Sequence, residues 1–134
     1  MLHTVGDDEL RALIDRWWTG IWGDGDLSVV DEICAEPYIR HTGMGSEVLS
    51  RREYKVRLAH TRQVLRGAVT TIDDQAIVGD KVWTRATSRG VNLTSVEHAV
   101  ISWIVIHRIA DGKIAETWAA TVPGVEWKDL HTDH

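Results

Sequence analysis

The sequence contains no phenylalanine and a single cysteine, Cys34. One cysteine excludes an intramolecular disulfide, and a chain without disulfides suits a reducing compartment. No apolar run approaches the roughly 20 residues that span a membrane, and the first twenty residues contain acids but no apolar segment typical of a signal peptide. We therefore expect a cytoplasmic protein that does not insert into membranes.

An excess of positive charge is also missing. The net charge is −5 with neutral histidines, and lysine and arginine are dispersed along the chain. Nucleic-acid binding normally requires a basic stripe, so the charge pattern argues against it. No two histidines stand at i, i+2 or i, i+4, and no glycine-rich phosphate loop occurs. We therefore expect no metal and no cofactor, although a zinc ion held by residues distant in sequence stays open.

Tryptophan, in contrast, is abundant, with seven residues in a chain of 134. A chain of this length is typical of one domain, and it buries enough surface to fold without a disulfide or a metal. We expect a single domain over residues 1–134, with residues 1–6 and 124–134 as flexible tails. Tryptophan suits core walls and pockets for flat apolar ligands.

The first half of the chain has helical patterns. Apolar residues recur at i, i+3, i+4 and i+7 over residues 7–22, and this stripe predicts one amphipathic helix there. A second helix is predicted over 26–34, and a capping box at Ser50 and Glu53 begins a third over 51–66. Between them, residues 38–41 are predicted to be extended and residues 42–49 to form a loop.

The second half has strand patterns. Four strands are predicted over residues 69–78, 81–91, 96–109 and 114–122, the last two joined by a turn at Asp111-Gly112. Helices followed by an antiparallel meander predict an α+β protein, in which three helices pack on one face of a curved sheet of four to six strands.

Two stretches resemble a known family. "WWTGIWGDGDLSVVDEICAEPYIRH" (residues 17–41) and "HRIADGKIAETW" (residues 107–118) are similar to the SnoaL-like branch of the nuclear-transport-factor-2-like superfamily. The resemblance implies a cone with one pocket at its wide end, and a homodimer formed through the outer face of the sheet. Relatives include polyketide cyclases, ketosteroid isomerases and dehydratases, besides domains that only bind, so the fold by itself does not define a reaction.

The resemblance also implies positions for chemical groups. Trp18 takes the place of the isomerases' oxyanion-hole tyrosine, and His41 falls near their base. Val105 falls where their oxyanion-hole acid would be, and it cannot donate a hydrogen bond. Ala119 stands where a cyclase acid is expected. The resemblance therefore implies a cavity without supplying the known catalytic sets.

Two histidines are the main candidates for chemistry. His107 shares one face of the strand 96–109 with Trp103 and Val105, and the resemblance favours that face pointing inward, so His107 is predicted to be a general acid–base group. The alternative is a core histidine with a hydrogen bond to a carbonyl. His41 is predicted to be its partner in the same cavity, or else a loop residue that packs the helix–strand junction.

We therefore predict an enzyme that uses no cofactor and performs acid–base chemistry, such as cyclisation, isomerisation or dehydration, on an apolar carbonyl-bearing small molecule like a polyketide intermediate. His107, His41 and Trp18 are the predicted catalytic residues. The predicted substrate-binding residues, for several of which core packing is the competing interpretation, are Trp22, Tyr38, Tyr54, Trp103, Val105, Thr117 and Ala119. The alternative is a binding domain without turnover, and a third reading is a structural protein with a filled cavity.

Overall fold

The computed structural model describes residues 6–61, 65–92, 97–128 and 130. Helical segments dominate the first part and long strands the second. In chain order the elements are α1 (Asp7–Arg16), η1 (Trp17–Asp24), α2 (Val29–Ile33), β1 (Cys34–Thr42), β2 (Gly45–Leu49), α3 (Arg51–Thr61), β3 (Leu65–Val78), β4 (Lys81–Asn92), β5 (His98–Ala110) and β6 (Lys113–Pro123).

The predicted first helix changes type along its length. It is an α-helix only as far as Arg16, and residues Trp17–Asp24 continue it as a π-helix. The widened turn buries two adjacent pairs, Trp17 with Trp18 and Ile21 with Trp22. Short π-helical segments are rare and are frequent at functional sites. The prediction of a regular α-helix to residue 22 is therefore wrong in its second half.

The segment between the second and third helices also differs from the prediction. Residues 42–49 were expected to be a loop, but Gly45–Leu49 forms β2, which pairs antiparallel with β1 through a turn at Gly43 and Met44. Helix α2 is shorter than expected, because the chain is already extended from Cys34. A strand of five residues that begins with a glycine carries too weak an apolar alternation to be recognised.

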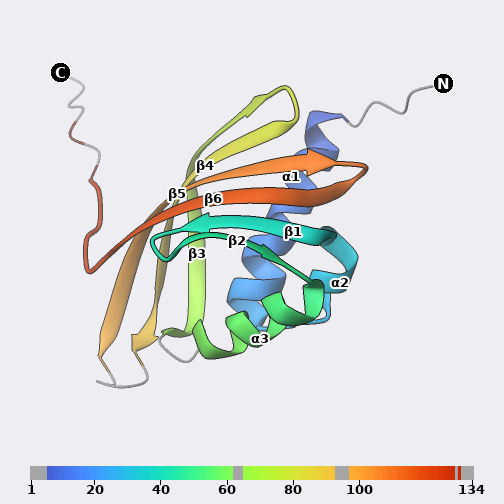
Figure 1. Cartoon of the computed structure of the whole chain (residues 1–134). Coiled ribbons are helices and arrows are strands. Elements are labelled where there is room, and N and C mark those ends of the chain that lie inside the picture. Colours follow the sequence, from blue (N-terminus) through green and yellow to red (C-terminus); the bar gives the residue numbers. More distant parts are fainter. Residues whose placement is uncertain (1–5, 62–64, 93–96, 129, 131–134) are drawn as a thin grey trace.

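The six strands form one mixed sheet in the order β2-β1-β6-β5-β4-β3. All neighbours are antiparallel except β1 and β6, which run parallel. In Figure 1 the strands β1, β2 and β6 lie in front of α1, so α1 covers the far face of the sheet. The predicted α+β architecture is confirmed, and the sheet has the upper number of strands that was expected.

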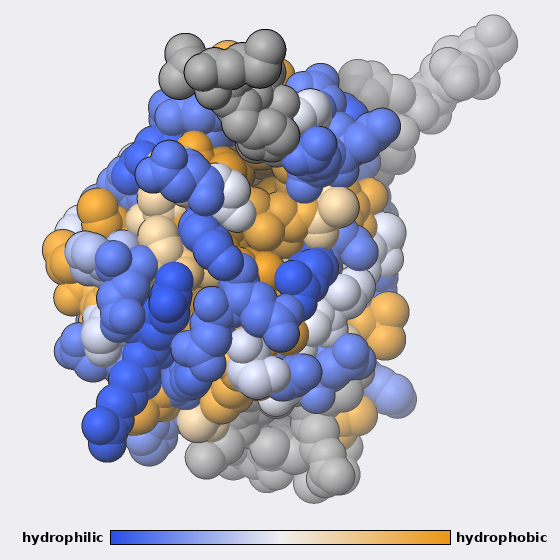
Figure 2. Space-filling view, turned by 90° about the vertical axis from the view of Figure 1, so that its right-hand side faces the viewer, coloured by the Kyte–Doolittle hydropathy of each residue, from blue (hydrophilic) through white to orange (hydrophobic). Residues whose placement is uncertain are grey.

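The face of the sheet beneath the helices, here called the inner face, carries the core. On β5 the side chains of Trp103, Val105 and His107 are all buried there, as predicted. The opposite, outer face is partly open, and Ile104 is 47% exposed. Figure 2, which views the molecule from the right-hand side of Figure 1, shows apolar atoms in the centre of that side with hydrophilic residues around them.

Part of the outer face is covered by the segment that follows β6. The Gly124 amide donates to the Val100 carbonyl at 2.8 Å, and the Ser102 hydroxyl donates to the Val125 carbonyl at 2.5 Å. These bonds explain why Ser102, an outer-face residue, is fully buried. None of the helices in the described residues is long and apolar enough to cross a membrane.

Candidate functional site

Four tryptophans form the centre of the inner face. Trp17, Trp18 and Trp22 come from the π-helix, and Trp103 comes from β5. Trp103 lies with its ring centroid 5.3 Å from that of Trp18 and 5.2 Å from that of Trp22. The rings meet edge to face, an arrangement that aromatic quadrupoles favour. The π-helix therefore brings three large rings onto one strand residue.

His107 lies beside this tryptophan cluster and is fully buried. Its ring centroid is 4.6 Å from that of Trp17, and its neighbours across the sheet are Val82 and Thr117. Burial lowers the pKa of His107 to about 3, because an apolar environment disfavours the charged imidazolium. The ring is therefore neutral at neutral pH, with one nitrogen carrying a proton and the other a lone pair.

Neither ring nitrogen of His107 has a hydrogen-bond partner among the described residues, and the same holds for the buried Nε1 atoms of Trp18 and Trp22. The other two rings of the cluster are satisfied, since Trp17 Nε1 donates to the Tyr54 hydroxyl and Trp103 Nε1 to Ser88 Oγ. Buried polar groups in native proteins are nearly always paired, so an unpaired group calls for an explanation. Here several such groups surround one cluster.

Two tyrosines complete the buried polar groups of the inner face. The Tyr38 hydroxyl is hydrogen-bonded to Thr117 Oγ1, and the ring centroid of Tyr38 is 4.8 Å from that of Tyr54. The Arg40 guanidinium lies over the Tyr54 ring, 4.7 Å from its centroid. Burial raises the pKa of both tyrosines. Tyr38 and Tyr54 are therefore neutral phenols buried in the core, and their role in substrate binding stays a prediction.

A groove lies next to the tryptophan cluster, between α1 and the edge strand β3. It has a volume of about 310 Å³ and is lined by Arg11, Ala12, Asp15, Trp18, Ile72 and Gln75. This volume is at the lower end of the range for small-molecule sites. Trp18 thus connects the groove to the cluster, whereas His107 is not among the groove's lining residues.

The polar residues of this groove were not predicted as site residues. Their signal was present in the sequence, since Arg11, Asp15 and Trp18 follow i, i+4 and i+7 spacing and must share one side of a helix. Gln75 lies on a strand, 57 positions after Trp18 in the sequence. No local sequence pattern predicts that Gln75 and Trp18 line the same groove.

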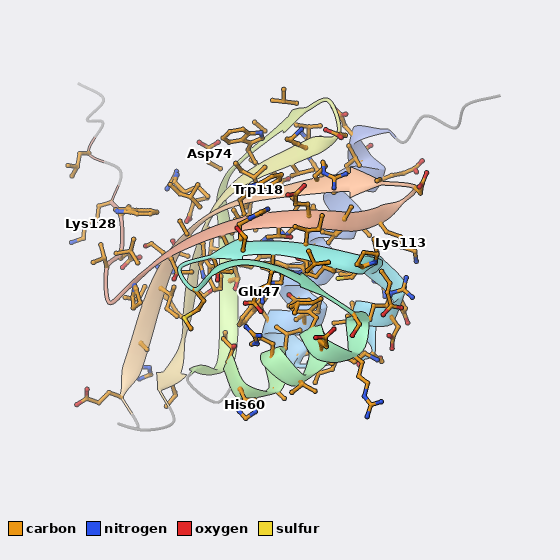
Figure 3. The ribbon with its side chains drawn as sticks, viewed as in Figure 1. Glu47, His60, Asp74, Lys113, Trp118 and Lys128 are labelled. Atoms are coloured by element: carbon orange, nitrogen blue, oxygen red, sulfur yellow. The ribbon has the colours of Figure 1, made fainter. Side chains whose placement is uncertain are left out.

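His41 lies on the other face of the sheet. Its imidazole stacks on Trp118, with centroids 5.2 Å apart and planes 13° apart. Trp118 projects from β6 on the side away from α1 (Figure 3). The prediction that His41 and His107 face one cavity is therefore wrong. The reason is the pairing of β1 with β6, which aligns Arg40 with Thr117 of the inner face and so turns the next residue outward.

The remaining predicted pocket residues lie on or near the inner face. Val105 and Thr117 are fully buried, and Ala119 is partly buried against the core. None of them carries a charge, and within the described residues no group of three or more His, Cys, Asp or Glu side chains could hold a metal ion. Burial raises the pKa of Cys34 to about 12, so its thiol stays protonated at neutral pH.

The outer face, predicted to form a homodimer, exposes large apolar side chains, Trp83 and Ile104 among them. Trp83 is 46% exposed and Ile104 is 47% exposed, and both line a shallow groove of about 180 Å³ together with Asp74 and Arg85. The homodimer stays a prediction.

Comparison with known proteins assigns the family. The model of the SnoaL-like domain matches residues 6–117, so the chain belongs to the SnoaL-like family. No curated protein matches the sequence.

Solved structures agree on the fold. TsrD from Streptomyces laurentii is 18% identical, with a TM-score of 0.75 over 88% of this chain and 91% of that one. A candidate SnoaL-like polyketide cyclase from Jannaschia sp. CCS1 is 14% identical, with a TM-score of 0.77 over 90% of both chains. IdmH from Streptomyces antibioticus, a candidate polyketide cyclase, is 21% identical, with a TM-score of 0.69 over 83% of this chain and 90% of that one. At these identities the likeness establishes the fold and no reaction.

Proposed function

We propose that this protein is an acid–base enzyme without a cofactor, and that it acts on a flat, apolar small molecule with a carbonyl group, as in cyclisation or isomerisation. His107 is the proposed acid–base group. Trp18 is the proposed N–H donor to the carbonyl oxygen. The observation that carries the proposal is the set of unpartnered polar atoms around one aromatic cluster, on His107, Trp18 and Trp22.

The energetics of these atoms support a bound ligand. Leaving a buried donor or acceptor unsatisfied costs about 1–3 kcal/mol for each group. A fold that needed only a packed core would gain stability from apolar residues at these positions. A ligand carbonyl that accepts from a tryptophan Nε1 and contacts His107 would restore the missing hydrogen bonds, while its flat apolar part would replace ring–ring contacts.

The neutral state of His107 suits proton transfer within one substrate. A neutral imidazole can accept a proton at one nitrogen and donate a proton from the other, as cyclisation and isomerisation through an enol require. A Trp18 N–H aimed at the carbonyl oxygen would stabilise the negative charge that develops there. Substrate entry requires the Trp18 ring to move toward the groove beside α1, because His107 is enclosed when the rings are packed.

An exchange reaction tests the proposal. 2-Tetralone is flat, apolar and carries acidic protons next to its carbonyl, and NMR in deuterium oxide measures their replacement. The wild-type protein is expected to accelerate this exchange, and His107→Leu should lower the acceleration about 100-fold or more. His60→Ala, at an exposed position of α3, is the matched control. Equal exchange by wild type and His107→Leu would refute the role of His107.

A binding protein without turnover is the second candidate. It is favoured by the absence of a carboxylate on the inner face at Val105 and Ala119, where relatives would place acids. Quenching of tryptophan fluorescence by 2-tetralone separates the two functions, because both predict quenching but only the enzyme predicts exchange. Tight binding with no exchange for this or related ketones would favour the binding protein.

A further inference from the structure

The outer face of the sheet contains a second group of polar residues, which the proposed function does not use. Ser46 lies on β2, His41 on β1 and Glu116 on β6. Ser46 Oγ is 2.7 Å from His41 Nδ1, and His41 Nε2 is 2.6 Å from Glu116 Oε2. A hydroxyl, an imidazole and a carboxylate thus stand in one line of hydrogen bonds, although 70 residues separate the serine from the glutamate.

The line of hydrogen bonds specifies the tautomer of a neutral His41 ring. Glu116 also accepts from Arg108 Nε at 3.0 Å, and the hydrogen bonds from His41 and Arg108 hold the pKa of this carboxyl below its usual range. Because the carboxylate only accepts, His41 carries its proton on Nε2. Nδ1 then has a lone pair for the Ser46 hydroxyl, as a general base for a serine nucleophile requires.

A stacking contact also holds the face of the His41 imidazole ring. Its ring stacks nearly parallel on Trp118, so ring rotation would break both hydrogen bonds and the stacking contact. Arg108 fixes the second oxygen of Glu116. These positioning contacts are the supporting groups that keep a catalytic base at a productive angle.

The surroundings of Ser46 indicate a substrate class. Ser46 is exposed, and Val48, two residues along the same strand and thus on the same face, is 66% exposed. Met44 in the adjacent turn is 86% exposed. The apolar side chains suit a short apolar acyl group. The strand β2 is the edge of the sheet, and an edge strand presents backbone N–H groups without a ladder partner, the kind of donor that stabilises an oxyanion.

From this arrangement we propose that Ser46, His41 and Glu116 form a second reactive site, which cleaves esters of small apolar carboxylic acids. Ser46 Oγ attacks the carbonyl carbon while its proton passes to His41 Nδ1. The C–O bond to the alcohol then breaks, and the alcohol oxygen takes that proton. Water, deprotonated by the same nitrogen, attacks the acyl-Ser46 carbonyl, which releases the acid and returns the proton to Ser46.

The test uses 4-nitrophenyl butyrate. Release of 4-nitrophenolate is followed by absorbance, and an acid-quenched sample is digested to locate the butyryl group by mass spectrometry. The label is expected on the peptide that contains Ser46, and Ser46→Ala should lose both label and turnover. His41→Gln should lower the rate about 100-fold. Glu116→Gln, which alters a positioning residue, should lower kcat and leave KM unchanged.

Two controls make the result decisive. Ser28 is an exposed serine whose hydroxyl is hydrogen-bonded to a carboxylate, Asp26, rather than to any of the described histidines, so Ser28→Ala should leave label and rate unchanged. Ser46→Cys, which keeps a nucleophile at this position, should still be acylated. Circular dichroism verifies that each variant is folded. Labelling at lysine, or labelling of Ser46 at the same rate in His41→Gln, would overturn the proposal.

This site and the inner-face site are tested independently, because the sheet separates them. Ser46→Ala should leave exchange of 2-tetralone unchanged, and His107→Leu should leave cleavage of the ester unchanged. Loss of ester cleavage in a folded His107→Leu protein would show that the ester reacts on the inner face, which would also contradict the assignment to Ser46.

Discussion

His107 and His41 lie on opposite faces of the same sheet and differ in almost every physical respect. His107 is fully buried, and neither of its ring nitrogens has a partner among the described residues. His41 is partly exposed, is hydrogen-bonded through both nitrogens, and stacks on Trp118. Hydrogen bonds and ring stacking therefore hold the His41 imidazole in position, whereas the described residues offer the ring nitrogens of His107 no hydrogen bond.

The polar groups of the two faces differ in their effect on the stability of the fold. On the outer face the hydrogen bonds to Ser46 and Glu116 contribute modestly to stability and also align the groups. On the inner face the polar nitrogens of His107 reduce stability, so their retention requires another purpose. Predictions of stability therefore test function here, since a core histidine without a function and a ligand-binding histidine should respond differently to replacement.

The largest effect is expected from the aromatic cluster of the inner face. Trp17→Ala should lower the free energy of unfolding by about 3–5 kcal/mol, the usual cost of removing a buried tryptophan. Trp118→Ala on the outer face should cost much less, because that ring is only partly buried. Urea denaturation of both variants measures the difference. Similar losses for the two would mean that the outer face contributes to the core.

The second largest effect is expected from acidification, which should lower the free energy of unfolding through His107. The native pKa of His107 is about 3, below the ordinary value of 6.5, so the unfolded chain binds a proton first as pH falls. The contribution of neutral His107 to the free energy of unfolding is complete above pH 6.5 and is lost progressively as the pH falls to 3. Between pH 7.5 and 5 this loss is about 2 kcal/mol.

The His107→Leu variant provides the reference for that loss. Urea denaturation at pH 7.5 and pH 5 should show the wild type losing about 2 kcal/mol more than His107→Leu. The same pH dependence in both proteins would mean that His107 titrates normally in the native state, and its neutral buried state would then be wrong.

Replacement at constant pH is expected to have a smaller effect of opposite sign. At pH 7.5 His107→Leu should raise the free energy of unfolding by about 1 kcal/mol, because it removes unsatisfied polar atoms from the core. The midpoint of urea denaturation should rise while the slope stays constant. A clear loss of stability would instead identify His107 as a satisfied structural residue.

The smallest effect is expected on the outer face. Glu116→Gln should lower the free energy of unfolding by at most about 1 kcal/mol, since partly exposed ion pairs contribute little. The lowered pKa of Glu116 places this contribution above the ordinary carboxyl pKa and removes it as pH falls through the native pKa. The difference from wild type should therefore persist at pH 5 and shrink in stronger acid, which distinguishes it from the His107 effect.

The strands of the second half could be predicted because their signals are local. Alternation along residues 98–110 and the turn at Asp111-Gly112 place Trp103, Val105 and His107 on one face, and the family resemblance selected that face as the inner one. Placing the three side chains on one face needs only the period of a strand and one turn, and the resemblance adds which face points inward. These assignments are confirmed by the burial of all three side chains.

The orientation of His41 could not be predicted in this way. It depends on the parallel pairing of β1 with β6, whose register shifts between Cys34 and Ile39. A shift of one residue moves a side chain to the other face of a sheet, and no local pattern reports it. One hydrogen-bond partner of His41 is also remote in sequence, since Glu116 is 75 residues away.

The lack of hydrogen-bond partners for the His107 ring could not be predicted either, because it also depends on non-local packing. The sequence predicted that His107 points inward, and left open whether a carbonyl satisfies its ring. That answer depends on how Trp17 and Trp18 pack over β5, and their packing follows from a π-helix that helical periodicity does not distinguish from an α-helix.

The central claim is that His107 is a neutral, unpartnered imidazole that a carbonyl-bearing ligand can reach. Nitrogen-15 NMR of the histidine rings from pH 8 to 4, with and without 2-tetralone, tests it most directly. The account predicts one histidine, identified by its absence in His107→Leu, that stays neutral throughout and whose ring-nitrogen signals move when the ketone is added. A His107 ring that titrates near pH 6.5 and does not respond to the ketone would contradict it.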